Sequence, residues 1–199
     1  VYLGPQIDHL RAYLTQAIAN RSTGVNVLIY GPPGTGKTEF VRSLAAAIDA
    51  DLYEVAVKSR YGAPLSGTRR LNGYSLAQEV LATRGSTLVI FDEIEDLQAG
   101  EEDEPALGGH KNGRMKGWFN QMLECNAVPT IWISNAVDFL DGAHRRRFDY
   151  HLFIDTPSLQ VRQTMLSQQV ATIGVGEQWC FDVAQNTELV PAVISRAVK

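Results

Sequence analysis

A glycine-rich segment, Gly31–Thr38, limits the possible folds of this chain more than any other part of the sequence. It reads GPPGTGKT and satisfies the pattern G-x-x-x-x-G-K-[ST]. Glycines let the backbone curl so that successive N–H groups point at phosphate oxygens, and a following helix presents its positive N-terminus to the same anion. Because an apolar stretch precedes the segment and an amphipathic one follows it, the sequence predicts a strand, a phosphate-binding loop and a helix in succession.

Individual residues of this loop have separate expected roles. Lys37 is expected to reach the β- and γ-phosphates of a nucleoside triphosphate, and Thr38 to hold Mg²⁺ through its hydroxyl. An ordinary glycine turn is the alternative, which the flanking strand and helix disfavour. The remaining residues of the expected cradle are Gly31, Pro32, Pro33, Gly34, Thr35 and Gly36.

The hydrophobic pattern alternates between strand-like and helix-like segments. This alternation implies an α/β fold of the P-loop type, a three-layer αβα sandwich with a mostly parallel five-stranded sheet. Residues 98–113 are acidic and then glycine-rich, and predict an exposed loop. The expected strands are 25–30, 52–57, 87–91, 130–134 and 151–154, and the expected helices are 7–19, 37–48, 75–83 and 118–123.

The pattern changes after Thr156-Pro157, where only helices are expected, at 160–170, 179–183 and 191–198. We therefore divide the chain into a P-loop core domain, 1–156, and a small helical lid, 157–199. Because the chain starts at Val1 and ends at Lys199 inside an expected helix, we interpret it as a fragment with an incomplete lid.

An acid pair, Asp92 and Glu93, follows the buried strand 87–91. In open α/β sheets ligands bind at the carboxyl ends of the strands. Asp92 is therefore expected to position the Mg²⁺ shell, and Glu93 to polarise a water molecule for attack on the γ-phosphate. Glu95 and Asp96 follow, so part of this acidic run is also typical of solvated surface.

These motifs together resemble the AAA+ ATPase family over nearly the whole chain. GPPGTGKT is similar to the family's Walker A motif, and the sequence FDEIED, which includes Asp92 and Glu93, is similar to its Walker B motif. The resemblance implies ATP and ADP as ligands, Mg²⁺ as cofactor, and hydrolysis of the β–γ phosphoanhydride. It also implies a hexameric ring in the full-length protein and a macromolecular substrate of unknown kind.

A strand ending in Ser134-Asn135 resembles the family's sensor 1, which implies that Asn135 helps to orient the attacking water. On residue type alone, an asparagine that closes a strand is more typical of a turn. Downstream, 140–149 resembles the second region of homology, which implies an arginine finger for a neighbouring subunit. Arg146 and Arg147 are the candidates, although the register within Arg145–Arg147 stays open and a solvated helix end is the alternative.

The sequence departs from the family pattern at the lid. Ala192 stands where the family's sensor 2 arginine is expected, and Arg196, about one helical turn later, is a possible substitute. Near the N-terminus, Ile7 and Asp8 resemble residues that flank the adenine, but a simple packing helix explains them equally well.

A second departure lies in the stretch around Gly67 and Arg70, which resembles the pore-loop region. Leu65 stands where an aromatic residue is expected, and Tyr61 is the nearest aromatic residue upstream. Threading of a polypeptide is therefore not favoured, and we expect Arg69 and Arg70 to meet an acidic partner or to face solvent.

The bulk composition limits the remaining function classes. The net charge of −4 does not indicate a nucleic-acid binder, although a local basic groove stays possible. No apolar run is long enough to cross a membrane. Cys125 and Cys180 lack metal-ligand spacing and are expected to be reduced core thiols of a cytoplasmic protein. Two alternatives to a remodelling ATPase stay open: a nucleotide-gated switch with slow or no hydrolysis, and a DNA-handling ATPase.

Overall fold

The computed structural model describes residues 4–99, 119–137, 142–171 and 174–197. Most of the expected loop at 98–113 lies outside these ranges, as do Trp118, residues 140–141 and Val198. In the described part, the strands form one sheet in the order β2-β3-β4-β1-β5, and each neighbouring pair runs parallel. The strands are β1 (Asn26–Tyr30), β2 (Asp51–Glu54), β3 (Thr87–Phe91), β4 (Thr130–Ser134) and β5 (Tyr150–Phe153).

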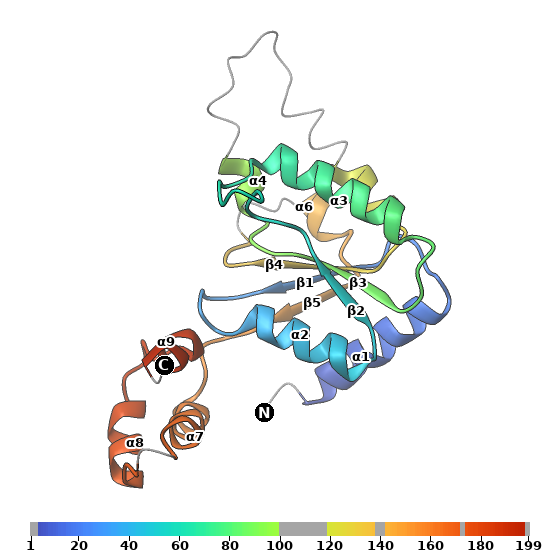
Figure 1. The fold of residues 1–199 in the computed structure, drawn as a ribbon. Helices are drawn as coiled ribbons and strands as arrows, with labels where there is room; N and C mark the ends of the chain where they lie inside the picture. Colours follow the sequence, from blue (N-terminus) through green and yellow to red (C-terminus); the bar gives the residue numbers. More distant parts are fainter. Residues whose placement is uncertain (1–3, 100–118, 138–141, 172–173, 198–199) are drawn as a thin grey trace.

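Helices cover both faces of this sheet, as Figure 1 shows. The helices α1 (Gly4–Ala19) and α2 (Lys37–Ala47) pack on one face, and α3 (Gly67–Leu81) and a helix over 119–125 pack on the other. The predicted αβα sandwich is therefore confirmed.

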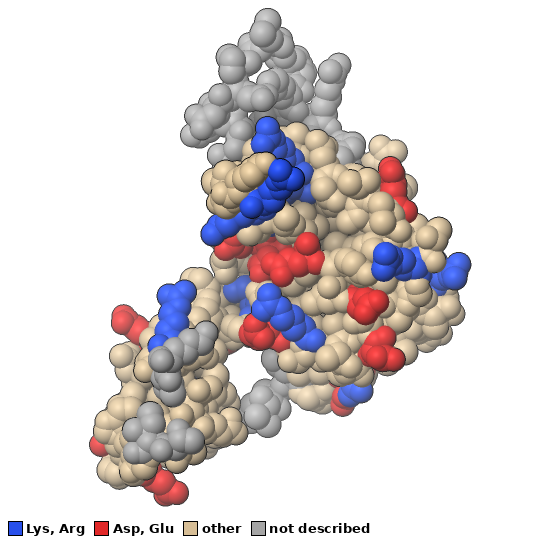
Figure 2. Space-filling model, in the orientation of Figure 1, with Lys and Arg blue, Asp and Glu red and all other residues tan. Residues whose placement is uncertain are grey.

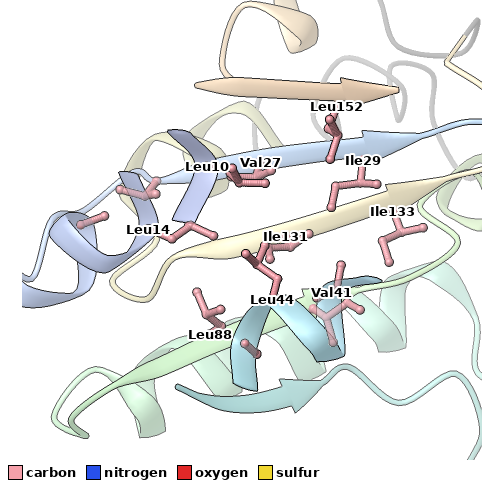
Figure 3. Packing of buried hydrophobic residues seen from close by; sticks show 14 of the residues in the cluster. Leu10, Leu14, Val27, Ile29, Val41, Leu44, Leu88, Ile131, Ile133 and Leu152 are labelled. Atoms are coloured by element: carbon pink, nitrogen blue, oxygen red, sulfur yellow. The ribbon is translucent and has the colours of Figure 1, made fainter. Parts of the chain in front are cut away.

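Side chains that alternate along the strands supply the two cores. In β1, Val27 and Ile29 belong to the cluster under α1 and α2, whereas Leu28 belongs to the opposite cluster. Figure 3 shows the first cluster, in which α1 and α2 cover the middle of the sheet. Its labelled members are Leu10, Leu14, Val27, Ile29, Val41, Leu44, Leu88, Ile131, Ile133 and Leu152.

Helix α3 is longer than the sequence pattern predicted. It starts at Gly67, after Ser66, whose side chain accepts a hydrogen bond from the Arg69 amide at 3.5 Å. Its buried face carries Arg70 and Gln78 among apolar residues. The buried Arg70 interrupts the apolar period before Ser75, which is why the predicted helix began only there.

The C-terminal part contains only helices in its described residues: α7 (Leu159–Val170), α8 (Glu177–Ala184) and α9 (Pro191–Ala197). They share a small apolar cluster of their own, and they project from one side of the sheet domain in Figure 1. The domain division at residue 156 stays a prediction. The buried members of this cluster are Leu166, Val170, Cys180, Ala184 and Ile194.

Two short helices complete the described elements. The helix α4 (Asp96–Ala99) follows β3, so Gln98 and Ala99 are helical and not part of the loop predicted at 98–113. The helix α6 (Gly142–Arg145) precedes β5. Cys180 is buried as predicted, but Cys125 is exposed at the end of the helix over 119–125, so the prediction of a core thiol was wrong there. Among the described residues, no helix is long and apolar enough to span a membrane.

Candidate nucleotide-binding site

The glycine-rich loop joins the end of β1 to the start of α2. Gly34 and Gly36 have φ angles of 76° and 89°, in the left-handed region that residues with a Cβ rarely adopt. A Cβ on Gly31 would lie 2.0 Å from the carbonyl oxygen of Ile154. This conformation requires glycine at these positions, and it brings the N-terminus of α2, with its free N–H groups, to the end of β1.

The other predicted cradle residues lie on the same turn. The Thr35 hydroxyl is buried and donates to the carbonyl oxygen of Pro32 at 3.0 Å, which holds the turn closed. Pro33 is exposed at its tip. The Thr35 side chain therefore helps the loop to keep its shape.

Lys37 lies under this loop with only 5% of its surface exposed. Its Nζ donates to the carbonyl oxygens of Gly31 and Pro32, each at 2.8 Å, and to Oδ1 of Asn135 at 2.9 Å. Burial lowers the pKa of Lys37, while the negative charges of Asp92 and Glu95 act in the opposite direction. The lysine thus sits where the loop, β1 and β4 converge.

Thr38 and Asp92 are in contact at the carboxyl end of the parallel sheet. The Thr38 hydroxyl donates to Oδ2 of Asp92 at 2.6 Å, although the two residues are far apart in sequence. A hydroxyl and a carboxylate oxygen are hard donors of the kind that Mg²⁺ prefers, so this pair fits the cation that the motif implies. The predicted metal residues are therefore neighbours.

Glu93 is exposed next to Asp92, in a strained backbone conformation with a φ angle of 53°. Desolvation raises the pKa of its carboxyl group, and the negative charges of Asp96, Asp92 and Glu95 raise it further, whereas Arg70 lowers it. A carboxylate with a raised pKa is a better proton acceptor, as a general base requires.

Asn135 follows β4 and lies between two charged side chains. Its Oδ1 accepts from Lys37, and its Nδ2 donates to Oε1 of Glu95 at 2.7 Å. Asn135 is thus in contact with the loop lysine, at the same carboxyl end of the sheet as Asp92. The carboxyl end of the sheet therefore brings together four predicted site residues: Lys37, Thr38, Asp92 and Asn135.

Arg70 occupies a different place from the one predicted. It is 1% exposed, so the expectation that it faces solvent was wrong, and its acidic contact is Asp96 of the same chain. Its guanidinium donates to the carbonyl oxygens of Asp92 and Glu93 and to the Asp96 carboxylate, and it stacks over the Phe91 ring at 4.5 Å. The residue therefore anchors the backbone of the acid pair to α3.

The remaining pore-region residues lie outside this group. Arg69 is exposed, and so is Tyr61, which retains 79% of its surface beneath the Arg60 guanidinium. Leu65 is half-buried. A Cβ on Gly67 would lie 3.1 Å from Cα of Leu97, so the first turn of α3 packs closely against α4.

The arginine segment contacts the core. Arg145 donates to the carbonyl oxygen of Val137 at 2.7 Å, and Arg147 pairs with Glu124 at 2.7 Å. Arg146 is exposed. Within the described residues, the contacts of Arg145 and Arg147 lie on Val137 and Glu124 and not on the glycine-rich loop.

The lid contacts the glycine-rich loop directly. The Ala192 amide donates to the Gly34 carbonyl oxygen at 3.2 Å, and a Cβ on Gly34 would lie 2.8 Å from the Val190 side chain. Arg196 is exposed on α9. Near the N-terminus, Asp8 is exposed and pairs with Arg11. Asp8 and Ala47 line a surface hollow, and Ala47 is at the end of α2 that lies away from the glycine-rich loop.

Comparison with known proteins gives the family of this site. The model of the AAA family, "ATPase family associated with various cellular activities", matches residues 27–156, which include the loop, the acid pair and Asn135. This match covers more than half of the chain. The chain therefore belongs to the AAA ATPase family.

Individual relatives agree with this assignment. The chain is 34% identical over 153 residues to ATPase family gene 2 protein homolog B of Rattus norvegicus, a match that covers 70% of the chain and 19% of the relative. It is 29% identical over 197 residues to the proteasome-activating nucleotidase of Methanoculleus marisnigri, covering 88% of the chain and 45% of the relative. The chain spans less than half the length of both relatives.

Solved structures support the fold. The HORMA:CdnC:Trip13 complex of E. coli MS115-1 contains a chain that matches with a TM-score of 0.67 at 19% identity, over 93% of this chain and 73% of that one. The FIGL-1 AAA domain in complex with ADP matches with a TM-score of 0.60 at 20% identity, over 84% of this chain and 56% of that one.

Two residues that contact the site, Arg70 and Glu95, were not predicted to do so from the sequence. For Arg70 the sequence carries a partial signal, because the apolar Leu71 and Tyr74 have helical spacing and Arg70 lies on the same face. For Glu95 no comparable signal exists, because its contacts lie on the separate strand β4 and the residue after it.

Proposed function

We propose that this chain binds ATP together with Mg²⁺ and hydrolyses the β–γ phosphoanhydride, using the energy to remodel a macromolecular partner. The observation that carries the proposal is the 2.6 Å contact between Thr38 and Asp92, beside a buried lysine at a glycine-rich loop. Membership of an ATPase family supports the choice of nucleotide. An ADP complex of a structural neighbour agrees with it.

In this proposal the loop amides and Lys37 bind the phosphate oxygens, and Thr38 and Asp92 hold the cation. When bound, Mg²⁺ supplies positive charge that offsets the charge on the β- and γ-phosphate oxygens. Glu93 accepts a proton from the attacking water, and Asn135 orients that water next to the γ-phosphate. Water attack and departure of ADP then give inorganic phosphate.

Arg146 or Arg147 would complete the site of a neighbouring copy in a hexameric ring. An arginine there offsets the negative charge on the transferred phosphoryl group. Arg146 is the better candidate, because Arg147 already pairs with Glu124 of its own chain whereas Arg146 is exposed.

The main alternative is a nucleotide-gated switch. It is motivated by Ala192 at the position of the expected sensor 2 arginine, where the lid contacts the loop by a backbone amide. A DNA-handling ATPase has less support, since the net charge is −4 and the basic band on the face drawn in Figure 2 lies directly beside a group of acidic side chains.

The substitution Glu93→Gln tests the enzyme against the switch. We expect it to keep ATP binding in the presence of Mg²⁺ and to lower phosphate release by about a hundredfold or more, because the amide cannot accept the proton. Steady-state phosphate release and equilibrium binding of a fluorescent ATP analogue measure the two quantities. The exposed Glu79 on α3 provides a matched control, Glu79→Gln, which should leave both unchanged. Unchanged turnover in Glu93→Gln contradicts the role of Glu93, and a wild-type protein that binds ATP without releasing phosphate favours the switch.

A further inference from the structure

The side chain of Glu95 is the starting point, because it contacts Asn135 from the side opposite to the loop. Its Oε1 accepts from the Asn135 backbone amide at 3.1 Å and from Nδ2 at 2.7 Å. Its Oε2 accepts from the buried Ser134 hydroxyl at 2.8 Å. Both carboxylate oxygens thus bind the end of β4.

The other end of the Asn135 amide meets a cation. Oδ1 accepts from Nζ of Lys37 at 2.9 Å, so the asparagine lies between an ammonium group and a carboxylate. An ammonium group only donates hydrogen bonds, and a carboxylate only accepts them. One orientation of the amide satisfies both partners, and the flipped orientation would set like groups against each other at both ends.

We propose that Glu95 is a positioning residue that fixes the orientation of the Asn135 side-chain amide, so that its oxygen faces Lys37 and the loop. The inference rests on the proposed function, since Asn135 matters to turnover only if ATP is hydrolysed at this site. Glu95 is not a catalytic residue under this proposal, because it acts through Asn135 and touches neither the nucleotide nor the attacking water.

The local fold explains why Glu95 can do this. The Ile94 amide donates to the Ile133 carbonyl oxygen at 3.0 Å, which holds the segment after β3 against the end of β4. Ile94 is fully buried and anchors that segment in the core, so the neighbouring Glu95 has a fixed backbone. A side chain held in this way loses little further entropy when it binds Asn135.

A first experiment reads the amide directly in the nucleotide-free protein. We expect Glu95→Ala to shift the Nδ2 amide resonances of Asn135 and to speed their exchange with water, because their acceptor is removed. The matched variant Glu54→Ala removes a carboxylate at the end of β2 and should leave these resonances in place. Unchanged Asn135 resonances in Glu95→Ala overturn the proposal, and this result does not depend on whether the protein hydrolyses ATP.

A second experiment reverses the polarity of the pair. Asn135→Asp alone puts a second carboxylate against Glu95 and should lower turnover by about a hundredfold. Adding Glu95→Gln lets an amide donate to the new carboxylate, whose other oxygen still accepts from Lys37, and should restore turnover by about tenfold or more over Asn135→Asp. A role in folding alone predicts no such rescue.

The control for that experiment is Asn135→Asp combined with Glu54→Gln, which should show no rescue. An absence of rescue by Glu95→Gln, in a wild-type background that does hydrolyse ATP, overturns the positioning role. A wild-type protein without hydrolysis refutes the proposed function instead, and the amide resonances then decide the question of Glu95.

Discussion

At the scale of single residues, the carboxyl group of Glu93 has the most unusual surroundings in the site. Its backbone adopts a positive φ angle, and three other acids, Asp92, Glu95 and Asp96, act on its charge. Its pKa is raised above the ordinary value of 4.5. Such strain and like-charge crowding persist when the surrounding structure enforces them, and they are common at functional sites.

The raised pKa of Glu93 leads to a prediction about stability. Because the folded protein holds this proton more tightly than the unfolded chain does, the contribution of Glu93 to stability falls as pH rises above 4.5, through the folded-state pKa. We therefore expect Glu93→Gln to melt at a higher temperature than the wild type at pH 7, and the difference to vanish below pH 4.5. Thermal unfolding between those pH values measures it. A difference that is constant with pH, or a Glu93→Gln protein that melts lower at pH 7, contradicts the raised pKa.

At the scale of elements, α3 holds the acidic segment that follows β3 in place. The Arg70 guanidinium spans the carbonyl oxygens of Asp92 and Glu93, and the first turn of α3 packs on α4 at Gly67. The segment after β3 presents backbone carbonyl oxygens to α3, and buried carbonyl oxygens need hydrogen-bond donors. An arginine at this buried position of α3 supplies donors that an apolar side chain lacks.

Two neighbouring arginines of α3 allow a matched test of this anchor. Arg70→Met removes the guanidinium donor from the Asp92 carbonyl oxygen and leaves the Glu93 carbonyl oxygen with the Asp96 amide as its donor, and we expect it to lower the free energy of unfolding by about 2 kcal/mol or more. Arg69→Met makes the same substitution at an exposed position and should change the free energy of unfolding by less than about 0.5 kcal/mol. Urea denaturation measures both variants. Equal effects of the two substitutions would mean that Arg70 does not anchor the acid pair.

Sequence patterns predicted the elements well where burial was apolar. The strands β1, β3 and β4 have apolar centres and lie where they were expected, and α2 follows the glycine-rich loop. The start of α3 was missed, because Arg70 occupies a buried position through hydrogen bonds and not through apolarity. A search for the hydrophobic period does not detect polar side chains that are buried through hydrogen bonds.

In the candidate site too, some features could be predicted from the sequence and others could not. The loop residues and Asp92 are encoded by short local motifs, so their contact at Thr38 could be predicted. The contact of Glu95 with Asn135 joins two segments that are distant in sequence, and only the parallel pairing of β3 with β4 brings them together.

At the scale of the whole molecule, the site lies where the sheet edge, α2 and the lid meet. The lid has its own small core and reaches the loop through Val190 and Ala192. The arginine segment instead is tied to Val137 and Glu124 of the core. We therefore expect ATP hydrolysis to use the loop and acid pair of one copy and an arginine of the next.

Phosphate release by mixtures of two inactive variants measures this shared hydrolysis most directly. Glu93→Gln lacks the base, and Arg146→Ala lacks the proposed finger, so each alone should lose about a hundredfold or more of the wild-type turnover. Mixed assemblies contain some interfaces that have both groups intact, so we predict that a mixture of the two regains a substantial part of the wild-type rate, increasingly so at higher protein concentration. A wild-type protein without Mg²⁺-dependent phosphate release, or a mixture no more active than its two components, would contradict hydrolysis at a site shared between copies.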